Sequence, residues 1–186
     1  MVNPWSVNYK TSPIRWSIFV LVFVLNSCVI KGQHPKSAQC GDTDFDRKVH
    51  SYLSYSIPVI GVKDAYLKKD QVYYLDAREK EEYDVSHIQN AKWVGYEDFT
   101  LERVGQIPRQ AQIIVYCSIG YRSEKIGEKL VKAGFKQVKN LYGSLFEWIN
   151  AGYPVVDNQS KVVQNIHTYD QSWSRWVTQK HYRKSH

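Results

Sequence analysis

The chain has 186 residues, of which 43% are hydrophobic, and a formal net charge of +7. This length supports one domain with extensions, and the hydrophobic share excludes a globally disordered chain. The positive charge is modest and is accompanied by neither a basic helix face nor a recognised nucleic-acid-binding module, so we expect no nucleic-acid partner.

The first residues have the order of an export signal. Lys10 and Arg15 precede a nearly unbroken apolar run over residues 16–25, and a small residue and Cys28 follow. The run is shorter than the roughly 20 residues that a membrane-spanning helix needs. This order resembles a bacterial lipoprotein signal, which is cut before the cysteine that carries the lipid.

The resemblance implies a signal peptide over residues 1–27 and lipidation at Cys28. A tether and a lead-in helix would then occupy residues 28–55, and the protein would be a membrane-anchored lipoprotein of the cell envelope, on the periplasmic or outer-surface side. An uncleaved anchor is an alternative, because Val29 and Ile30 extend the apolar stretch. An ordinary secretory signal is another, and we favour the lipoprotein over both.

Patterns typical of helices and strands alternate beyond the tether. We expect helices over residues 42–55, 62–69, 79–83, 96–104, 122–132 and 144–150, and strands over residues 57–60, 72–75, 91–94, 113–116 and 138–141. This alternation predicts an α/β fold in which helices cover both faces of a mainly parallel sheet. Ligands of such sheets bind beyond the carboxyl ends of the strands.

One of these strand ends carries a cysteine. The run over residues 113–116 leads into Cys117, a short turn containing Gly120, and then a helical pattern that begins near Ser123. The first turn of a helix has unpaired N–H groups and the positive end of the helix dipole. A thiol placed there ionises more easily, as nucleophilic cysteine chemistry requires.

Further segments occur with this one in a fixed order. They are Tyr74-Leu75-Asp76-Ala77-Arg78, Glu82-Tyr83, His87-Ile88 with Ala91, Cys117 to Ser123, Ala133-Gly134-Phe135, Leu141-Tyr142-Gly143 with Trp148, and Gly152-Tyr153-Pro154-Val155. In this order they resemble the rhodanese (sulfurtransferase) domain family. The resemblance covers about residues 56–157 and implies a single rhodanese-like domain there.

The resemblance also implies a chemistry. Cys117 would take sulfane sulfur from a donor such as thiosulfate or polysulfide, hold it as a persulfide, and pass it to an acceptor such as cyanide or a thiol. No metal or organic cofactor is implied, the six histidines are scattered, and a monomer is expected. The implied substrate-binding loop is Ser118, Ile119, Gly120, Tyr121 and Arg122, with Asp76, Arg78 and Ser123 as supporting residues.

The loop separates this chemistry from its rivals. Four residues lie between Cys117 and Arg122, one fewer than in the related phosphatases and arsenate reductases, which need room for a tetrahedral oxyanion. Ser118 stands where many sulfurtransferases have a basic residue, which places efficient use of thiosulfate in question. Ser144 replaces the second residue of a common Gly-Gly pair, a difference that we take to be minor. A non-enzymatic module that binds a partner or senses redox state is the alternative function.

Several residues have two interpretations. In the interpretation that we prefer, Asp76 caps the following turn and Arg78 makes a structural ion pair; the alternative is that they support the loop. Cys40 could resolve an oxidised Cys117, but we prefer an inert residue in the linker.

The extension over residues 158–186 lies outside the resemblance. Trp173 and Trp176, spaced by three, predict an amphipathic helix that packs on the domain, with a membrane surface as the alternative. The basic run over residues 180–184 predicts a solvated tail.

Overall fold

The computed structural model describes residues 38–186. The predicted signal over residues 1–27 and the predicted lipidation site Cys28 lie outside these residues. Within residues 38–186, no helix has both the length and the apolar character needed to cross a membrane.

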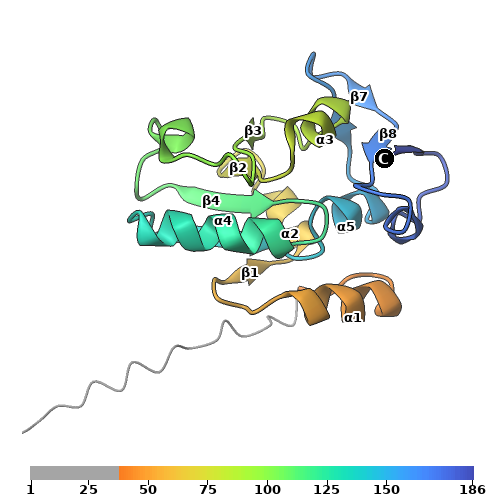
Figure 1. Ribbon diagram of the computed structural model, residues 1–186, viewed down its shortest axis with the longest axis horizontal. Coiled ribbons are helices and arrows are strands. Elements are labelled where there is room, and N and C mark those ends of the chain that lie inside the picture. The colour runs from red at the N-terminus through yellow and green to blue at the C-terminus, as the bar shows by residue number, and fades with distance from the viewer. Residues whose placement is uncertain (1–37) are drawn as a thin grey trace, which may run out of the picture.

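A five-stranded parallel sheet forms the centre of the domain (Figure 1). Its order is β1-β5-β4-β2-β3, so the strand that leads to Cys117, β4, is the central one. The strands are β1 (Val59–Ile60), β2 (Tyr73–Asp76), β3 (Lys92–Trp93), β4 (Gln112–Tyr116) and β5 (Gln137–Leu141).

Five α-helices and a 3-10 helix connect or flank these strands. They are α1 (Thr43–Tyr52), α2 (Val62–Leu67), α3 (Lys80–Val85), the 3-10 helix η1 (Leu101–Val104), α4 (Tyr121–Lys132) and α5 (Ser144–Asn150). The helix α1 begins where the sequence predicts, because the Asp42 carboxylate accepts the free N–H groups of Asp44 and Phe45. The predicted fold class, a mainly parallel sheet covered by helices, is confirmed.

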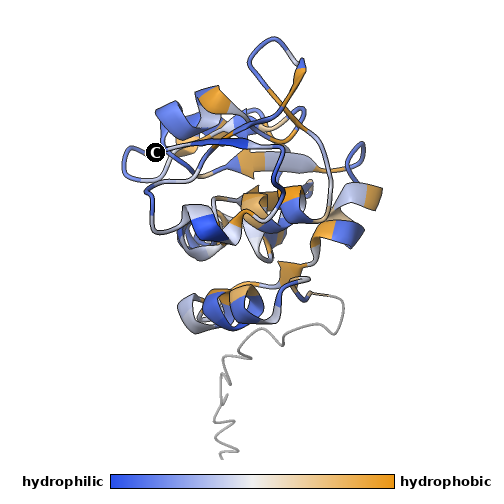
Figure 2. Cartoon of the chain, turned by 90° about the vertical axis from the view of Figure 1, so that its right-hand side faces the viewer, coloured by the Kyte–Doolittle hydropathy of each residue, from blue (hydrophilic) through white to orange (hydrophobic). Residues whose placement is uncertain are grey.

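The sheet divides the core in two. Along β4, Ile113 and Val115 pack on the side of α4, whereas Ile114 and Tyr116 pack on the side of α1, α2 and α5. Side chains of a strand alternate between faces, so a strand buried on both faces is apolar throughout. Apolar residues accordingly gather in the interior of the domain (Figure 2).

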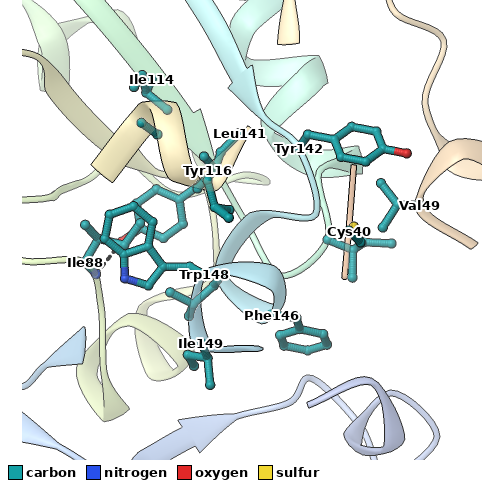
Figure 3. Packing of buried hydrophobic residues seen from close by; sticks show 14 of the residues in the cluster. Cys40, Val49, Ile88, Ile114, Tyr116, Leu141, Tyr142, Phe146, Trp148 and Ile149 are labelled. Atoms are coloured by element: carbon teal, nitrogen blue, oxygen red, sulfur yellow. Dashed lines mark hydrogen bonds between the residues drawn. The ribbon is translucent and has the colours of Figure 1, made fainter. Parts of the chain in front are cut away.

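Tyr116 also makes a polar contact within the core on the side of α1, α2 and α5. Its hydroxyl accepts the Ile88 N–H at 3.1 Å, drawn as a dashed line in Figure 3. Trp148 of α5 lies in the same cluster and donates its indole N–H to the Pro154 carbonyl. These bonds satisfy polar atoms that burial would otherwise leave without partners.

The helix predicted over residues 96–104 is wrong for its first half, and only η1 forms. The Arg103 guanidinium reaches back to the Val94 carbonyl at 2.7 Å and pairs with the Asp98 carboxylate at 2.6 Å. These side-chain bonds hold the segment as turns. Local helix propensity is a weak preference that tertiary contacts override.

The helix predicted in the C-terminal extension is also wrong. After β6 (Val155–Val156), the chain forms β7 (Val162–Val163), β8 (Asn165–His167), the 3-10 helix η2 (Ser174–Trp176) and β9 (Arg183–Ser185). The strands β8 and β9 pair in parallel, so the predicted basic tail is partly a strand.

The physical reason lies in how this segment is bonded after its start. The Asp170 carboxylate caps the start by accepting the N–H groups of Ser172 and Trp173, but the bonds that follow are of the 3-10 kind, such as the Trp176 N–H to the Trp173 carbonyl. Asn150 of α5 then binds the Trp176 carbonyl and the Thr178 N–H, which ends the helix after one turn. The spacing of three between Trp173 and Trp176 fits the 3-10 period. The segment still packs on the domain, and the Trp176 ring lies 5.5 Å from Phe45 of α1.

Candidate active site

Cys117 follows the last residue of β4 and faces the first turn of α4. Its Sγ accepts the Gly120 N–H at 3.1 Å, and the Ser123 hydroxyl lies 3.6 Å from the same sulfur. The residue is only 1% exposed, but it lines a pocket of about 480 Å³. The thiol is therefore at the bottom of an open pocket rather than sealed in the core.

The surroundings of Cys117 favour its thiolate. Burial alone would raise the pKa of the thiol, but the Arg122 charge and the N–H groups of Ser123 and Gly120 outweigh it, so the pKa lies below its ordinary value. Donors at a helix N-terminus act in this direction because they stabilise the charged form.

Gly120 allows the loop to turn tightly, because glycine adopts a positive φ without strain. Its φ is +122°, and a Cβ there would lie 3.3 Å from Leu53. Asn140 of β5 holds the turn from the other side: its amide donates to the Gly120 carbonyl at 2.9 Å, and its Oδ1 lies 2.7 Å from the Ser123 hydroxyl. The predicted support from Ser123 is therefore an arrangement of two side chains, one of which the sequence analysis missed.

The N-terminus of α5 holds the opposite side of the loop. The Cys117 N–H donates to the Ser144 hydroxyl at 3.0 Å, and the Leu145 and Phe146 N–H groups donate to the Cys117 and Ser118 carbonyls, both at 3.1 Å. Ser144 has a φ of +51°, a conformation that glycine adopts more easily. The replacement at Ser144 is thus not minor, because its hydroxyl binds the backbone of the cysteine itself.

Arg122 is held by an acidic side chain that the sequence analysis did not assign to the site. Glu82 of α3 accepts both terminal nitrogens of the guanidinium, at 2.6 and 2.9 Å. The Ser118 hydroxyl lies 3.0 Å from Arg122 and 3.1 Å from Glu82. Arg122 lowers the pKa of Glu82 despite its burial. The sequence held one signal, because Glu82-Tyr83 is among the segments that carry the family resemblance.

Asp76 and Arg78 are fully buried and paired with one another, with a closest approach of 2.7 Å. Arg78 also donates to the Ser86 carbonyl at 2.7 Å. Neither residue is among the described residues that line the pocket. The geometry fits the preferred structural ion pair. His87 likewise has a structural contact, from its Nδ1 to the Tyr83 carbonyl at 3.0 Å.

Cys40 is not a residue of an exposed linker. It packs in the core with Val49 and Tyr142 (Figure 3). Burial and the neighbouring carboxylates Glu147 and Asp46 raise the pKa of its thiol. Cys40 and Cys117 are both free thiols, so the structure shows no disulfide between them.

The predicted loop residues come together at the pocket. Cys117, Ser118, Ile119, Tyr121 and Arg122 all line it, whereas Gly120 contributes through its backbone. Two glutamates and several aromatic side chains from outside the loop complete the lining. Among the described residues, no group of three or more His, Cys, Asp or Glu side chains could hold a metal ion.

The comparisons with known proteins agree with this geometry. Residues 62–151 match the family model of the rhodanese-like domain. The chain is 30% identical over 91 residues to thiosulfate sulfurtransferase GlpE of Coxiella burnetii, covering 49% of this chain and 83% of that protein. It is 32% identical over 96 residues to thiosulfate sulfurtransferase 18 of Arabidopsis thaliana, covering 44% of this chain and 70% of that protein. The chain belongs to the rhodanese-like family.

Solved structures show the same fold. BH2092 protein of Bacillus halodurans superposes with a TM-score of 0.51 at 20% identity, over 60% of this chain and 85% of that one. The rhodanese-like domain of Alr3790 from Anabaena has a TM-score of 0.51 at 23% identity, over 54% and 80% of the two chains. Helix α1 and the C-terminal extension both lie outside the matched family domain.

Proposed function

We propose that this protein is a sulfurtransferase that moves sulfane sulfur from a donor such as thiosulfate or polysulfide to a thiophilic acceptor through a Cys117 persulfide. The observation that carries this proposal is the Cys117 sulfur beneath the Gly120 N–H, at the N-terminus of α4 and open to a pocket. Two relatives named as thiosulfate sulfurtransferases support it.

The reaction needs two displacements. The Cys117 thiolate attacks the outer sulfur of thiosulfate, a Cys117 S–S bond forms, and sulfite leaves with the electron pair of the broken S–S bond. The persulfide carries the same negative charge as the thiolate did, so the donors that stabilise the thiolate also suit the intermediate. An acceptor then attacks the outer sulfur, and Cys117 leaves as the thiolate, which restores the protein.

The position of Arg122 favours sulfur transfer over phosphatase chemistry. Both terminal nitrogens of its guanidinium bind Glu82. Together with the bond to the Ser118 hydroxyl, these bonds take three of the five N–H donors of the guanidinium, which leaves fewer for a phosphate, a group that usually binds a fork of such donors. The charge of Arg122 still reaches Cys117 and favours the thiolate.

An intact-mass experiment tests the proposal. The full chain is incubated under argon with thiosulfate and, separately, with polysulfide, beside Cys117→Ser and the matched variant Cys40→Ser. We expect the parent and Cys40→Ser to gain one sulfur atom, which cyanide releases as thiocyanate. If neither donor adds sulfur to the parent, the non-enzymatic module becomes the better interpretation; hydrolysis of an aryl phosphate would instead favour the phosphatase.

We also propose that a lipid on Cys28 holds the domain at a membrane of the cell envelope. The order of charges, apolar run and cysteine at the N-terminus supports this. Expression in a bacterial host with an alkyne-bearing fatty acid tests it. Label should enter the parent and be lost in Cys28→Ala, whereas label that stays in Cys28→Ala would contradict the proposal.

A further inference from the structure

The pocket above Cys117 is lined in part by residues that lie outside the matched family domain. Tyr52 at the end of α1 and Tyr169 and Trp173 of the C-terminal extension all line it. These segments flank residues 62–151, over which the family model matches. The domain therefore supplies the thiol, and the extensions supply part of the surface that a substrate meets.

The aromatic side chains are packed against one another. The Tyr52 ring lies edge-on to Trp173 with centroids 5.6 Å apart, and edge-on to Tyr121 at 6.3 Å. The guanidinium carbon of Arg122 lies over the Tyr169 ring, 5.4 Å from the centroid of that ring. Edge-on aromatic contacts of this kind hold the rings in fixed orientations.

These rings are also open to solvent. Tyr52 is 37% exposed, Tyr121 is 41% exposed and Tyr169 is 56% exposed. Exposed aromatic side chains that gather in one place mark a binding surface more often than a packing defect. Here they surround the mouth of the pocket that leads to Cys117.

The pocket fits an organic molecule better than a small anion. Its volume of about 480 Å³ lies within the range of about 300–1,000 Å³ of small-molecule sites, far more than cyanide or sulfite fills. Its lining includes Glu79 and Glu97, and the one cation among the described lining residues, Arg122, is already paired with Glu82. The lining thus offers no uncompensated positive charge to draw thiosulfate.

We propose that Tyr52, Tyr169 and Trp173 make the pocket selective for an acceptor thiol that carries an aromatic body. This inference rests on the proposed sulfurtransferase function and adds the class of acceptor. The thiol sulfur of the acceptor attacks the outer sulfur of the Cys117 persulfide. The S–S bond to Cys117 breaks, its electron pair stays on Cys117 as the thiolate, and the acceptor leaves as an organic persulfide that keeps the thiol proton.

Single-turnover transfer tests the inference. The full chain is loaded with sulfur from polysulfide, freed of excess donor and mixed with either 2-phenylethanethiol or ethanethiol. Both are primary alkyl thiols of similar reactivity, and only the first carries a ring. Loss of the persulfide is followed by intact mass. We expect the aromatic thiol to react about ten-fold faster, the gain that aromatic contacts of this size supply.

Variants locate the selectivity. Tyr52→Ala and the double variant Tyr52→Ala/Trp173→Ala should lower the ratio of the two rate constants towards one, with the larger effect in the double variant. Tyr73→Ala is the matched control: Tyr73 is 46% exposed at the start of β2, the end of the sheet away from Cys117, and this variant should keep the parental ratio. Circular dichroism verifies that each variant is folded. If the double variant does not fold, the single variant Tyr52→Ala tests the inference.

The possible outcomes distinguish failure of this inference from failure of the proposed sulfurtransferase function. A parent that forms the persulfide but transfers sulfur equally fast to both thiols overturns the inference and leaves the sulfurtransferase function standing. A selective parent whose ratio Tyr52→Ala does not lower overturns the assignment to these side chains. A parent that takes sulfur from neither polysulfide nor thiosulfate overturns the proposed function, and the inference with it.

Discussion

Cys117 and Cys40 are both buried cysteines, 1% and 8% exposed, yet their surroundings act on them in opposite ways. The Cys117 sulfur faces N–H donors and the Arg122 charge, which hold its pKa below the ordinary value. Burial raises the pKa of Cys40, and the neighbouring carboxylates Glu147 and Asp46 raise it further. Burial by itself therefore does not decide whether a cysteine is reactive, because the sign of the neighbouring charge decides it.

The largest expected difference between the two cysteines is in reactivity. At pH 7 iodoacetamide should alkylate Cys117 at least about 100-fold faster than Cys40, because only the thiolate is nucleophilic and only Cys117 opens to a pocket. Peptide mapping by mass spectrometry measures both rates in one sample. After treatment with thiosulfate or polysulfide, the label on Cys117 alone should be carried on one added sulfur atom, because a persulfide is itself alkylated. Equal labelling of the two cysteines would show that the donors around Cys117 do not stabilise its thiolate.

Arg122→Gln should be the next largest perturbation. It removes the positive charge near Cys117, so the pKa of Cys117 rises and the midpoint of its alkylation profile moves to higher pH. It also leaves the nearly buried Glu82 carboxylate without its partner, which should cost about 3 kcal/mol of unfolding free energy. Denaturant titration and the pH dependence of alkylation measure the two effects.

A double variant separates the two roles of Arg122. Glu82→Gln/Arg122→Gln removes both charges, so most of the lost stability should return. The pKa of Cys117 should stay high, because the charge that lowered it is still missing. If the double variant also recovered the parental alkylation profile, the Arg122 charge would not be what lowers the pKa of Cys117.

Gly143→Ala probes the packing around Cys40. Gly143 has a φ of +68°, and an added Cβ would lie 2.7 Å from the Cys40 sulfur and 2.6 Å from Glu147. We expect a loss of about 2–3 kcal/mol in unfolding free energy from backbone strain and overpacking together. Gly134→Ala is the control, because its φ is +94° but no atom lies within 4 Å of the added Cβ. A loss no greater than that of Gly134→Ala would show that the Cys40 site is loosely packed.

The smallest expected effect is the pH dependence that Glu147 contributes. Burial raises the pKa of Glu147 above its ordinary value, against the opposing Gly41 N–H at 2.8 Å. Below the ordinary pKa the carboxyl is protonated in both folded and unfolded chains. As the pH rises from there through the folded pKa, the unfolded chain releases its proton first, so the folded state loses stability.

Glu147→Gln should remove this loss. The amide oxygen can still accept the Gly41 N–H, and no charge forms in the core at any pH. The variant should therefore gain stability relative to the parent between pH 4 and pH 7, as measured by denaturant titration at each pH. A constant difference across this range would mean that Glu147 titrates alike in the folded and unfolded chains.

The amino-acid sequence by itself determined the fold class and the position of the candidate nucleophile. Both depend on contiguous patterns: alternating strands and helices, and a β-branched run that ends at Cys117 before Gly120 and a helix. Strand β4 and helix α4 lie within one or two residues of the predicted ranges for this reason. Local chemistry was sufficient to place the thiol at a helix N-terminus.

Only the tertiary structure decided what surrounds that thiol. Glu82 meets Arg122 across 40 residues of sequence, and the Ser144 hydroxyl meets the Cys117 N–H across 27. Tyr52 meets Trp173 from the opposite end of the described chain. No periodicity records such pairings, because they depend on how the sheet orders its strands and on where the extensions pack. The same folding placed Cys40 beside Glu147 and so gave two buried cysteines opposite electrostatic environments.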